Sequence, residues 1–335
     1  MNGANPAMID RLRVAIKRRL VALGLLSLPL PFWPAWWCGQ EADAVFEARS
    51  FSVFAPLVAE VTRNLDADIG VNRFQTGSWQ YDGEWNLVTW QATAVGLCQL
   101  ILRFPEQKAS LAPLVERALD RLLATETRRF DTRSWGEDAL AGLDGNHGHL
   151  AFLGYANVAL SLWRSIEPQN RFADWNDRMS EALEKRFAAS QLGLVETYPR
   201  EVYPVDNTPA LASLGLWHRA TGRGDQDLLK RLLQNFRERY RDSGSGLLFQ
   251  CVRVDNGEPL DKPRASGTAF AAFWLSLIDP TLSRELYQSL KESCQANFFG
   301  FTAFTEYPPS VEPGTGDVDS GPVIFGLSFS GTAFG

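Results

Sequence analysis

Residues 265–274 read Ala-Ser-Gly-Thr-Ala-Phe-Ala-Ala-Phe-Trp, a stretch too apolar for a helix that faces water. It suits the inner wall of a helical domain. Residues 230–237 read Lys-Arg-Leu-Leu-Gln-Asn-Phe-Arg, where charged and apolar side chains are separated at helical spacing. Such an amphipathic helix suits an outer wall. The two stretches predict two layers of helices.

The same patterns extend along the chain, whereas the alternation between tight Asn-Gly or Asp-Gly turns that marks β-hairpins is missing. We predict ten helices, over residues 43–65, 88–103, 108–127, 148–166, 172–190, 208–221, 225–241, 267–278, 281–297 and 321–334. Short and long connections alternate between them, and the long ones cover residues 66–87, 128–147, 191–207, 242–266 and 298–320. Each long connection holds Gly, aromatic residues and carboxylates. A recurrence of about 50 to 60 residues is typical of stacked helical hairpins, and closure into a ring brings all the long connections to one rim.

The connections Gly193-Leu194-Val195-Glu196-Thr197-Tyr198-Pro199 and Gly246-Leu247-Leu248-Phe249-Gln250 each join an outer helix to an inner one. They resemble those of the α/α-toroid superfamily, which includes six-hairpin glycosidases, sugar epimerases and lyases, linalool dehydratase-isomerase and class II terpene cyclases. The resemblance covers residues 43–335 and implies an all-α fold, an α/α toroid of about five to six helical hairpins. About five hairpins are visible, so a sixth is either absent or formed by the N-terminal arm.

The composition is that of a globular protein, with 45% hydrophobic and 21% charged residues. The net charge of −6 leaves no basic stripe for a phosphate backbone, which argues against nucleic acid as a partner. The four cysteines are far apart and form no Cys-x-x-Cys pair. We expect buried free thiols, with a disulfide as the alternative.

Residues 1–42 form a basic and apolar N-terminal arm, separate from the domain at 43–335. Five basic residues precede an uncharged run over 20–38; they are Arg11, Arg13, Lys17, Arg18 and Arg19. This order resembles a signal or anchor segment, although three prolines break the helix that a membrane span needs. Three interpretations stay open: a membrane-surface anchor, an unusual signal sequence, or an arm packed on the domain. The protein is membrane-associated or periplasmic if residues 11–38 are an anchor, and otherwise cytoplasmic.

The loop over residues 314–322 is the strongest candidate site. Asp317 and Asp319 lie two residues apart in a Gly-rich stretch before an apolar helix. Two carboxylates on a desolvated rim can raise one pKa, and that group then serves as a general acid. The loop resembles the Asp-x-Asp-Asp acid motif of class II terpene cyclases, with Ser320 in place of the last Asp. The alternative is a helix N-cap.

The second candidate lies over residues 196–207, where carboxylate and phenol groups alternate. Its members are Glu196, Tyr198, Glu201, Tyr203 and Asp206. An extended segment presents these groups along one rim, and in the six-hairpin glycosidases rim carboxylates of this kind protonate a leaving oxygen or activate water. The alternative is that Asp206 or Asn207 caps the next helix while Glu196 and Glu201 pair with arginines.

The third candidate, Asp144-Gly145-Asn146-His147-Gly148-His149, holds two of the three histidines in the chain. Histidine suits proton transfer near neutral pH, so we expect His147 to be catalytic, with Asp144 and His149 in contact with substrate. His-x-His can also bind a metal, but no further ligand is signalled nearby, and we predict no metal. Capping by Asp144 or Asn146 is the competing explanation.

Three further residues are candidates for substrate contact. Arg264 can clamp a carboxylate or phosphate at the start of an inner helix, or pair with a rim acid. Trp79 and Trp135 lie in polar connections and offer flat faces that stack on sugar rings or shield a cation. Ordinary packing is the alternative for each Trp.

Together these patterns predict an enzyme that needs no cofactor and acts by acid–base chemistry on a small molecule or an oligosaccharide. A carbohydrate hydrolase, lyase or epimerase is the first hypothesis, with Asp319 or Asp317 as the acid and Glu196 or Glu201 as its partner. A terpenoid isomerase, dehydratase or cyclase is the second, and a non-catalytic binding or scaffold protein is the third. A dry aromatic cavity favours the terpenoid, and a wet cleft favours the sugar.

Overall fold

The computed structural model describes residues 6–27, 29–67 and 69–335. Residues 1–5 of the predicted arm lie outside the described residues. The chain forms two compact units, one of Met1–Phe54 with Asn297–Thr302 and one of Ala55–Ala296 with Ala303–Gly335.

The first unit is helical and interrupted. It holds α1 (Pro6–Ser27), the short 3-10 helix η1 (Leu30–Phe32), α2 (Trp33–Phe46) and η2 (Phe51–Val53). The predicted single helix over 43–65 is wrong, because α2 ends at Phe46 and the next helix begins only at Ala55. In between, the Ser50 hydroxyl caps η2 by accepting the amide of Ser52.

Within the described residues, Val14–Phe46 is long and apolar enough to cross a membrane by length and composition. Its apolar side chains, such as those of Leu20 and Trp33, are exposed. A signal sequence near an N-terminus has the same composition. All three interpretations of the arm therefore stay predictions, and recovery of the full-length protein in a detergent-free soluble cytoplasmic fraction excludes the anchor and the signal sequence.

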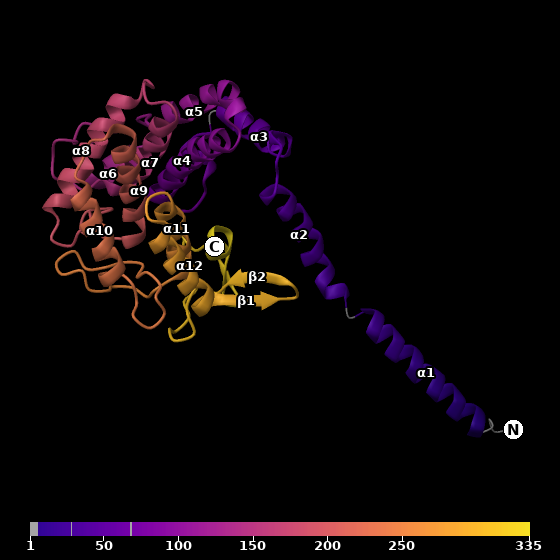
Figure 1. Ribbon diagram of the computed structural model, residues 1–335. Coiled ribbons are helices and arrows are strands. Elements are labelled where there is room, and N and C mark those ends of the chain that lie inside the picture. The colour runs from indigo at the N-terminus through magenta and orange to yellow at the C-terminus, as the bar shows by residue number, and fades with distance from the viewer. Residues whose placement is uncertain (1–5, 28, 68) are drawn as a thin grey trace. The chain divides into compact units, whose positions relative to one another are not determined.

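The second unit is built mainly from five outer helices that alternate with five inner helices along the described chain. The outer helices are α3 (Ala55–Asp66), α5 (Lys108–Leu122), α8 (Ala173–Ala189), α10 (Gln226–Arg239) and α12 (Pro280–Cys294). The inner helices are α4 (Trp79–Arg103), α7 (Leu150–Ile166), α9 (Pro204–Thr221), α11 (Ala265–Ser276) and α13 (Phe329–Phe334). Successive inner helices pack on one another, and the colour in Figure 1 runs from purple to yellow around this series. The predicted all-α fold of α/α-toroid type is confirmed.

Small and hydrogen-bonded residues allow the inner helices to pack closely. A Cβ on Gly154 of α7 would lie 3.2 Å from the Ala210 Cβ of α9, so the two backbones approach tightly there. The buried Asn157 amide donates to the hydroxyls of Ser180 and Ser213 at 2.9 and 3.0 Å. These bonds join α7 to α8 and α9 and satisfy polar groups that would otherwise be costly to bury.

Helix α4 begins at Trp79, nine residues before the predicted start at 88. Gly83 suggests a turn in the sequence, but here it is helical and packs against α6 (Arg129–Trp135), a short helix in the predicted loop over 128–147. A Cβ on Gly83 would lie only 2.4 Å from the Phe130 Cβ. A Gly is therefore needed at this position for close packing. The next residue, Glu84, lies within helix α4.

This packing predicts opposite effects for two Gly→Ala changes in the same helix. We expect Gly83→Ala to lower the free energy of unfolding by about 1–3 kcal/mol, because its methyl overlaps Phe130. The matched control, Gly96→Ala, meets nothing within 4 Å and should raise stability by roughly 0.5–1 kcal/mol through helix propensity. Urea denaturation measures both, and an equal effect of the two changes contradicts the close contact.

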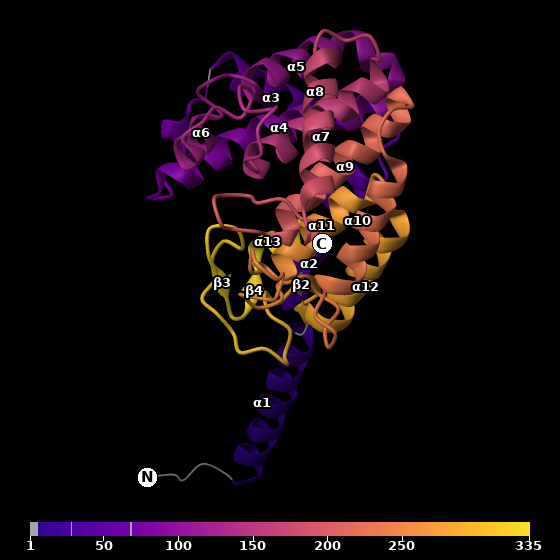
Figure 2. The same cartoon turned by 90° about the vertical axis from the view of Figure 1, so that its left-hand side faces the viewer.

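Two short antiparallel pairs of strands interrupt the C-terminal region. Strands β1 (Gln295–Phe298) and β2 (Phe301–Phe304) form one, and β3 (Val323–Ile324) and β4 (Leu327–Ser328) form the other, which lies in the long C-terminal connection in Figure 2. The predicted helix over 321–334 is thus wrong before Phe329. Phe325 and Gly326 have φ of 53° and 80°, which a helix does not accept.

All four cysteines are free thiols. Cys98 and Cys294 are buried as expected, Cys251 is partly buried, and Cys38 is exposed.

Candidate acid–base site

Three carboxyl groups from distant parts of the second unit act on one another. Glu84 lies in α4, Asp206 in the first turn of α9, and Asp319 in the connection before α13. The charges of Asp319 and Asp206 both raise the pKa of Glu84, and the charge of Asp206 raises the pKa of Asp319. The fold therefore brings together acids from three hairpins.

Glu84 is the most strongly perturbed of the three. Burial raises its pKa to about 8 despite the hydroxyl of Tyr198, which donates a hydrogen bond to Oε1. A carboxyl group with this pKa is mostly protonated at neutral pH and can donate a proton.

Asp206 is held by a tyrosine from the neighbouring inner helix. The Tyr155 hydroxyl donates to Oδ1 at 2.8 Å, and burial raises the pKa of Asp206 to about 6. Neither Asp206 nor Asn207 caps α9, because its N-cap residue is Tyr203 and no side chain caps it. The Asn207 side chain accepts the Val195 amide at 2.8 Å.

Asp319 reaches solvent and accepts a hydrogen bond from the buried Gln250 amide at 3.2 Å. The surrounding protein excludes much of the water, and this desolvation, with the charges of Asp206 and Asp317, raises the pKa of Asp319 to about 7. Such a group exchanges protons readily in either direction near neutral pH.

Asp317 behaves oppositely, although it is only two residues away. Burial favours its neutral form, but hydrogen bonds from the Ser320 amide and from Arg264 outweigh burial and lower its pKa. Arg264 also donates to Asp261. The salt-bridge alternative for Arg264 is therefore the one observed, and Asp317 stays charged, which suits positioning of the loop.

Of the two glutamates of the second candidate, Glu201 acts on the carboxyl group of Glu84, whereas Glu196 is not among the charges that raise its pKa. Glu201 is exposed and accepts from the Tyr203 hydroxyl at 3.1 Å, and its charge contributes to the raised pKa of Glu84. Glu196 accepts the Arg200 amide at 3.0 Å. Among the described contacts, none joins Glu196 to Asp319, and neither glutamate pairs with an arginine side chain.

Three aromatic rings, each from a different inner helix, contact one another in a row that begins at Tyr155. Phe270 of α11 stacks on Tyr155 with ring centroids 6.0 Å apart, and Phe334 of α13 meets Phe270 edge-on at 5.0 Å. The two predicted Trp platforms both have partners within the protein. The Arg133 guanidinium lies 4.1 Å from the Trp79 ring centroid, and Trp135 stacks on a histidine.

The third candidate forms a separate cluster, in which His147 and His149 lie near Glu137. Asp144 is exposed, and its backbone carbonyl accepts from Lys185. The described contacts do not connect these histidines to Asp319.

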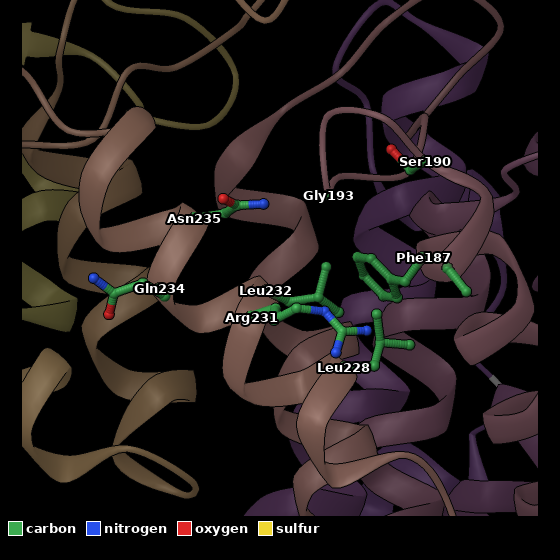
Figure 3. Close-up of a pocket in the computed structure, with 9 residues that line it drawn as sticks. Phe187, Ser190, Gly193, Leu228, Arg231, Leu232, Gln234 and Asn235 are labelled. Carbon is green, nitrogen blue, oxygen red and sulfur yellow. The ribbon is translucent and has the colours of Figure 1, made fainter.

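A surface pocket lies between α8 and α10 on the outer wall (Figure 3). Phe187, Leu228 and Leu232 supply its apolar side, and Arg231 is the one titratable side chain among the lining residues that the structure describes. It therefore lacks a pair of acid–base groups.

Sequence reasoning missed Glu84 and Tyr155. The predicted connection over 66–87 includes Glu84, and the pattern Trp-Gln-Tyr-Asp-Gly-Glu-Trp over 79–85 holds the same mixture of acids and rings as the other candidates. Tyr155 carries one hydroxyl in an otherwise apolar helix, and no pattern singled it out.

The family model described as linalool dehydratase/isomerase matches residues 159–306, less than half of the chain. No curated protein matches. A solved structure, "Structural Analysis of C. acetobutylicum ATCC 824 Glycoside Hydrolase From Family 105", is similar at 13% identity and a TM-score of 0.41, over 82% of this chain and 95% of that one. Outer and inner helices alternate in five successive hairpins, so the chain has a fold of α/α-toroid type.

Proposed function

We propose that the protein is an enzyme that removes water from an unsaturated alcohol of terpenoid type, adds water to the product alkene, or moves the hydroxyl group. The observation that carries this proposal is the group of three carboxyls with pKa values of about 8, 7 and 6 at one site. The partial match to the linalool dehydratase/isomerase model supports the same class of substrate.

The three carboxyls suit both proton transfers of such a reaction. Protonated Glu84 donates its proton to the hydroxyl, and the C–O bond breaks with its electron pair leaving on water. Asp319 then takes a proton from the adjacent carbon, and the C–H electron pair becomes the new double bond. The reverse steps hydrate the alkene, and proton exchange with solvent resets the two acids.

The aromatic rings beside Asp206 support an apolar substrate. The faces of aromatic rings stabilise a partial positive charge on carbon. Tyr155 and Phe270 supply such rings, and the carboxyl group of Asp206, which contacts Tyr155, can add a negative charge. The two Trp residues expected to stack on a sugar have other partners.

One observation favours a carbohydrate substrate instead. Asp317, Asp319 and Glu201 are exposed, so this side of the site is open to water. A wet cleft suits a sugar hydrolase or lyase, in which the same acids protonate the glycosidic oxygen or activate water.

A single assay separates the two substrates. The purified protein is incubated in ¹⁸O-water with linalool or with a panel of plain and unsaturated oligosaccharides. We expect a dehydrated alkene and ¹⁸O-labelled alcohols from linalool, and no cleavage of the oligosaccharides. Oligosaccharide cleavage with unchanged linalool supports the carbohydrate enzyme, and no reaction with either substrate contradicts the proposal.

A further inference from the structure

Glu137, His147 and His149 bring three potential metal ligands together outside the acid–base site. One ligand atom of each residue lies within 4.8 Å of the others. His149 is fully buried, whereas the side chains of His147 and Glu137 are 54% and 41% exposed. The cluster therefore has a buried floor and an open side through which an ion can enter.

His149 is held with one ring nitrogen directed at this cluster. Its Nδ1 lies 2.6 Å from Oδ2 of the buried Asp131. We assign the proton of the neutral ring to Nδ1, so that Nδ1–H donates a hydrogen bond to this carboxylate oxygen. The other nitrogen, Nε2, then carries a lone pair and is buried without a hydrogen-bond partner. Its neighbour is Glu137 Oε2 at 3.6 Å, which is too far for a hydrogen bond and is itself an acceptor. A cation between two lone pairs that face each other in this way would be bound by both.

The spacing of the ligand atoms fits a small divalent ion. His147 Nδ1 lies 3.0 Å from Glu137 Oε2, and His149 Nε2 lies 3.6 Å from the same oxygen. Tetrahedral zinc with bonds of about 2.0–2.1 Å separates its ligand atoms by roughly 3.3 Å. These two separations bracket this value, and the two histidine nitrogens lie within 4.8 Å of each other.

We propose that Glu137, His147 and His149 bind one Zn²⁺ ion, with a fourth coordination position open to water. Two histidines and one glutamate with an open position are a ligand set of zinc enzymes. Asp131 orients a ligating histidine through its second ring nitrogen, as carboxylates beside zinc sites commonly do. The ion would act as a Lewis acid toward a bound oxygen on the exposed side.

The surroundings keep the ligands in place. Trp135 packs on both imidazole rings, with centroids 5.3 Å from His147 and 5.0 Å from His149. The buried Arg186 donates to the carbonyls of Gly142 and His147 at 2.9 and 2.6 Å, which fixes the loop between the ligands. Arg186 brings one positive charge, and the carboxylates of Asp131 and Glu137 exceed it, so the cluster still attracts a cation.

Zinc titration of the chelator-treated full-length protein tests the proposal. We expect one equivalent of Zn²⁺ per chain, and Co²⁺ in its place should give the visible absorption of a low-coordinate site. His147→Gln and Glu137→Gln should each weaken Zn²⁺ binding by about 100-fold or more, since each removes a ligand. Asp131→Asn should weaken it by roughly 10- to 100-fold through the orientation of His149.

His218→Gln is the matched control, because His218 pairs with Glu184 at 2.7 Å outside the cluster. Its zinc affinity should equal that of the unmodified chain. His147 and Glu137 are half exposed, so their variants should fold, which circular dichroism verifies. The proposal is overturned if the unmodified chain binds no zinc, or if the folded His147→Gln and Glu137→Gln variants bind it unchanged.

Discussion

Asp319→Asn is expected to lower turnover by about 10²- to 10⁴-fold, the usual contribution of a positioned acid or base. The amide keeps the shape of the side chain and can still meet Gln250, but it cannot accept or release a proton at neutral pH. Steady-state kinetics on the substrate identified by the ¹⁸O-water assay measure the loss in kcat.

Asp227→Asn is the control for this change. Asp227 lies on the outer helix α10, with a side chain that is 79% exposed. It should leave kcat unchanged. A folded Asp319→Asn variant with full activity removes Asp319 from the reaction.

Glu84→Gln is expected to change how stability depends on pH. Burial raises the pKa of Glu84 from its ordinary 4.5 to about 8, so the folded state holds a proton that the unfolded state releases. The stability from this proton is complete below about pH 4.5 and is lost as the pH rises through about 8. Glutamine stays neutral, so the variant does not lose this stability. We expect the loss in the unmodified chain to be about 2–4 kcal/mol, which allows for the partial exposure of Glu84 to solvent.

Thermal unfolding of both proteins between pH 5 and pH 9 provides the measurement. The variant should gain stability relative to the unmodified chain as the pH rises, while Glu60→Gln on the exposed side of α3 controls for the loss of a carboxylate. Parallel curves for the Glu84→Gln variant and the unmodified chain contradict the burial of a neutral Glu84.

The helical hairpins were predictable because inner and outer helices differ strongly in composition. Helices such as α9 and α11 are buried almost throughout, and α10 buries only Leu228, Leu232 and Phe236 along one stripe. The two short strand pairs were not predictable, because strands of two to four residues are too short to show alternation.

The site was only partly predictable, for reasons that lie in three-dimensional packing. Gly83 resembles a turn residue in the sequence, and only the position of Phe130 explains it as a helix contact, so Glu84 was missed. The pKa values of Asp317 and Asp319 move in opposite directions because Arg264, 53 positions away from Asp317, pairs with only one of them. No local pattern contains that information.

Glu137, the third residue of the proposed zinc site, was not predicted from the sequence either. It lies ten residues before His147, and the fold brings it to the histidines.

The convergence of acids from separate hairpins can be measured by carboxyl ¹³C titration of Glu84 in the unmodified chain and in Asp319→Asn. If the two side chains share one site, loss of the Asp319 charge should lower the apparent pKa of Glu84 from about 8, while Asp227→Asn leaves it unchanged. An identical titration of Glu84 in all three proteins contradicts the shared site.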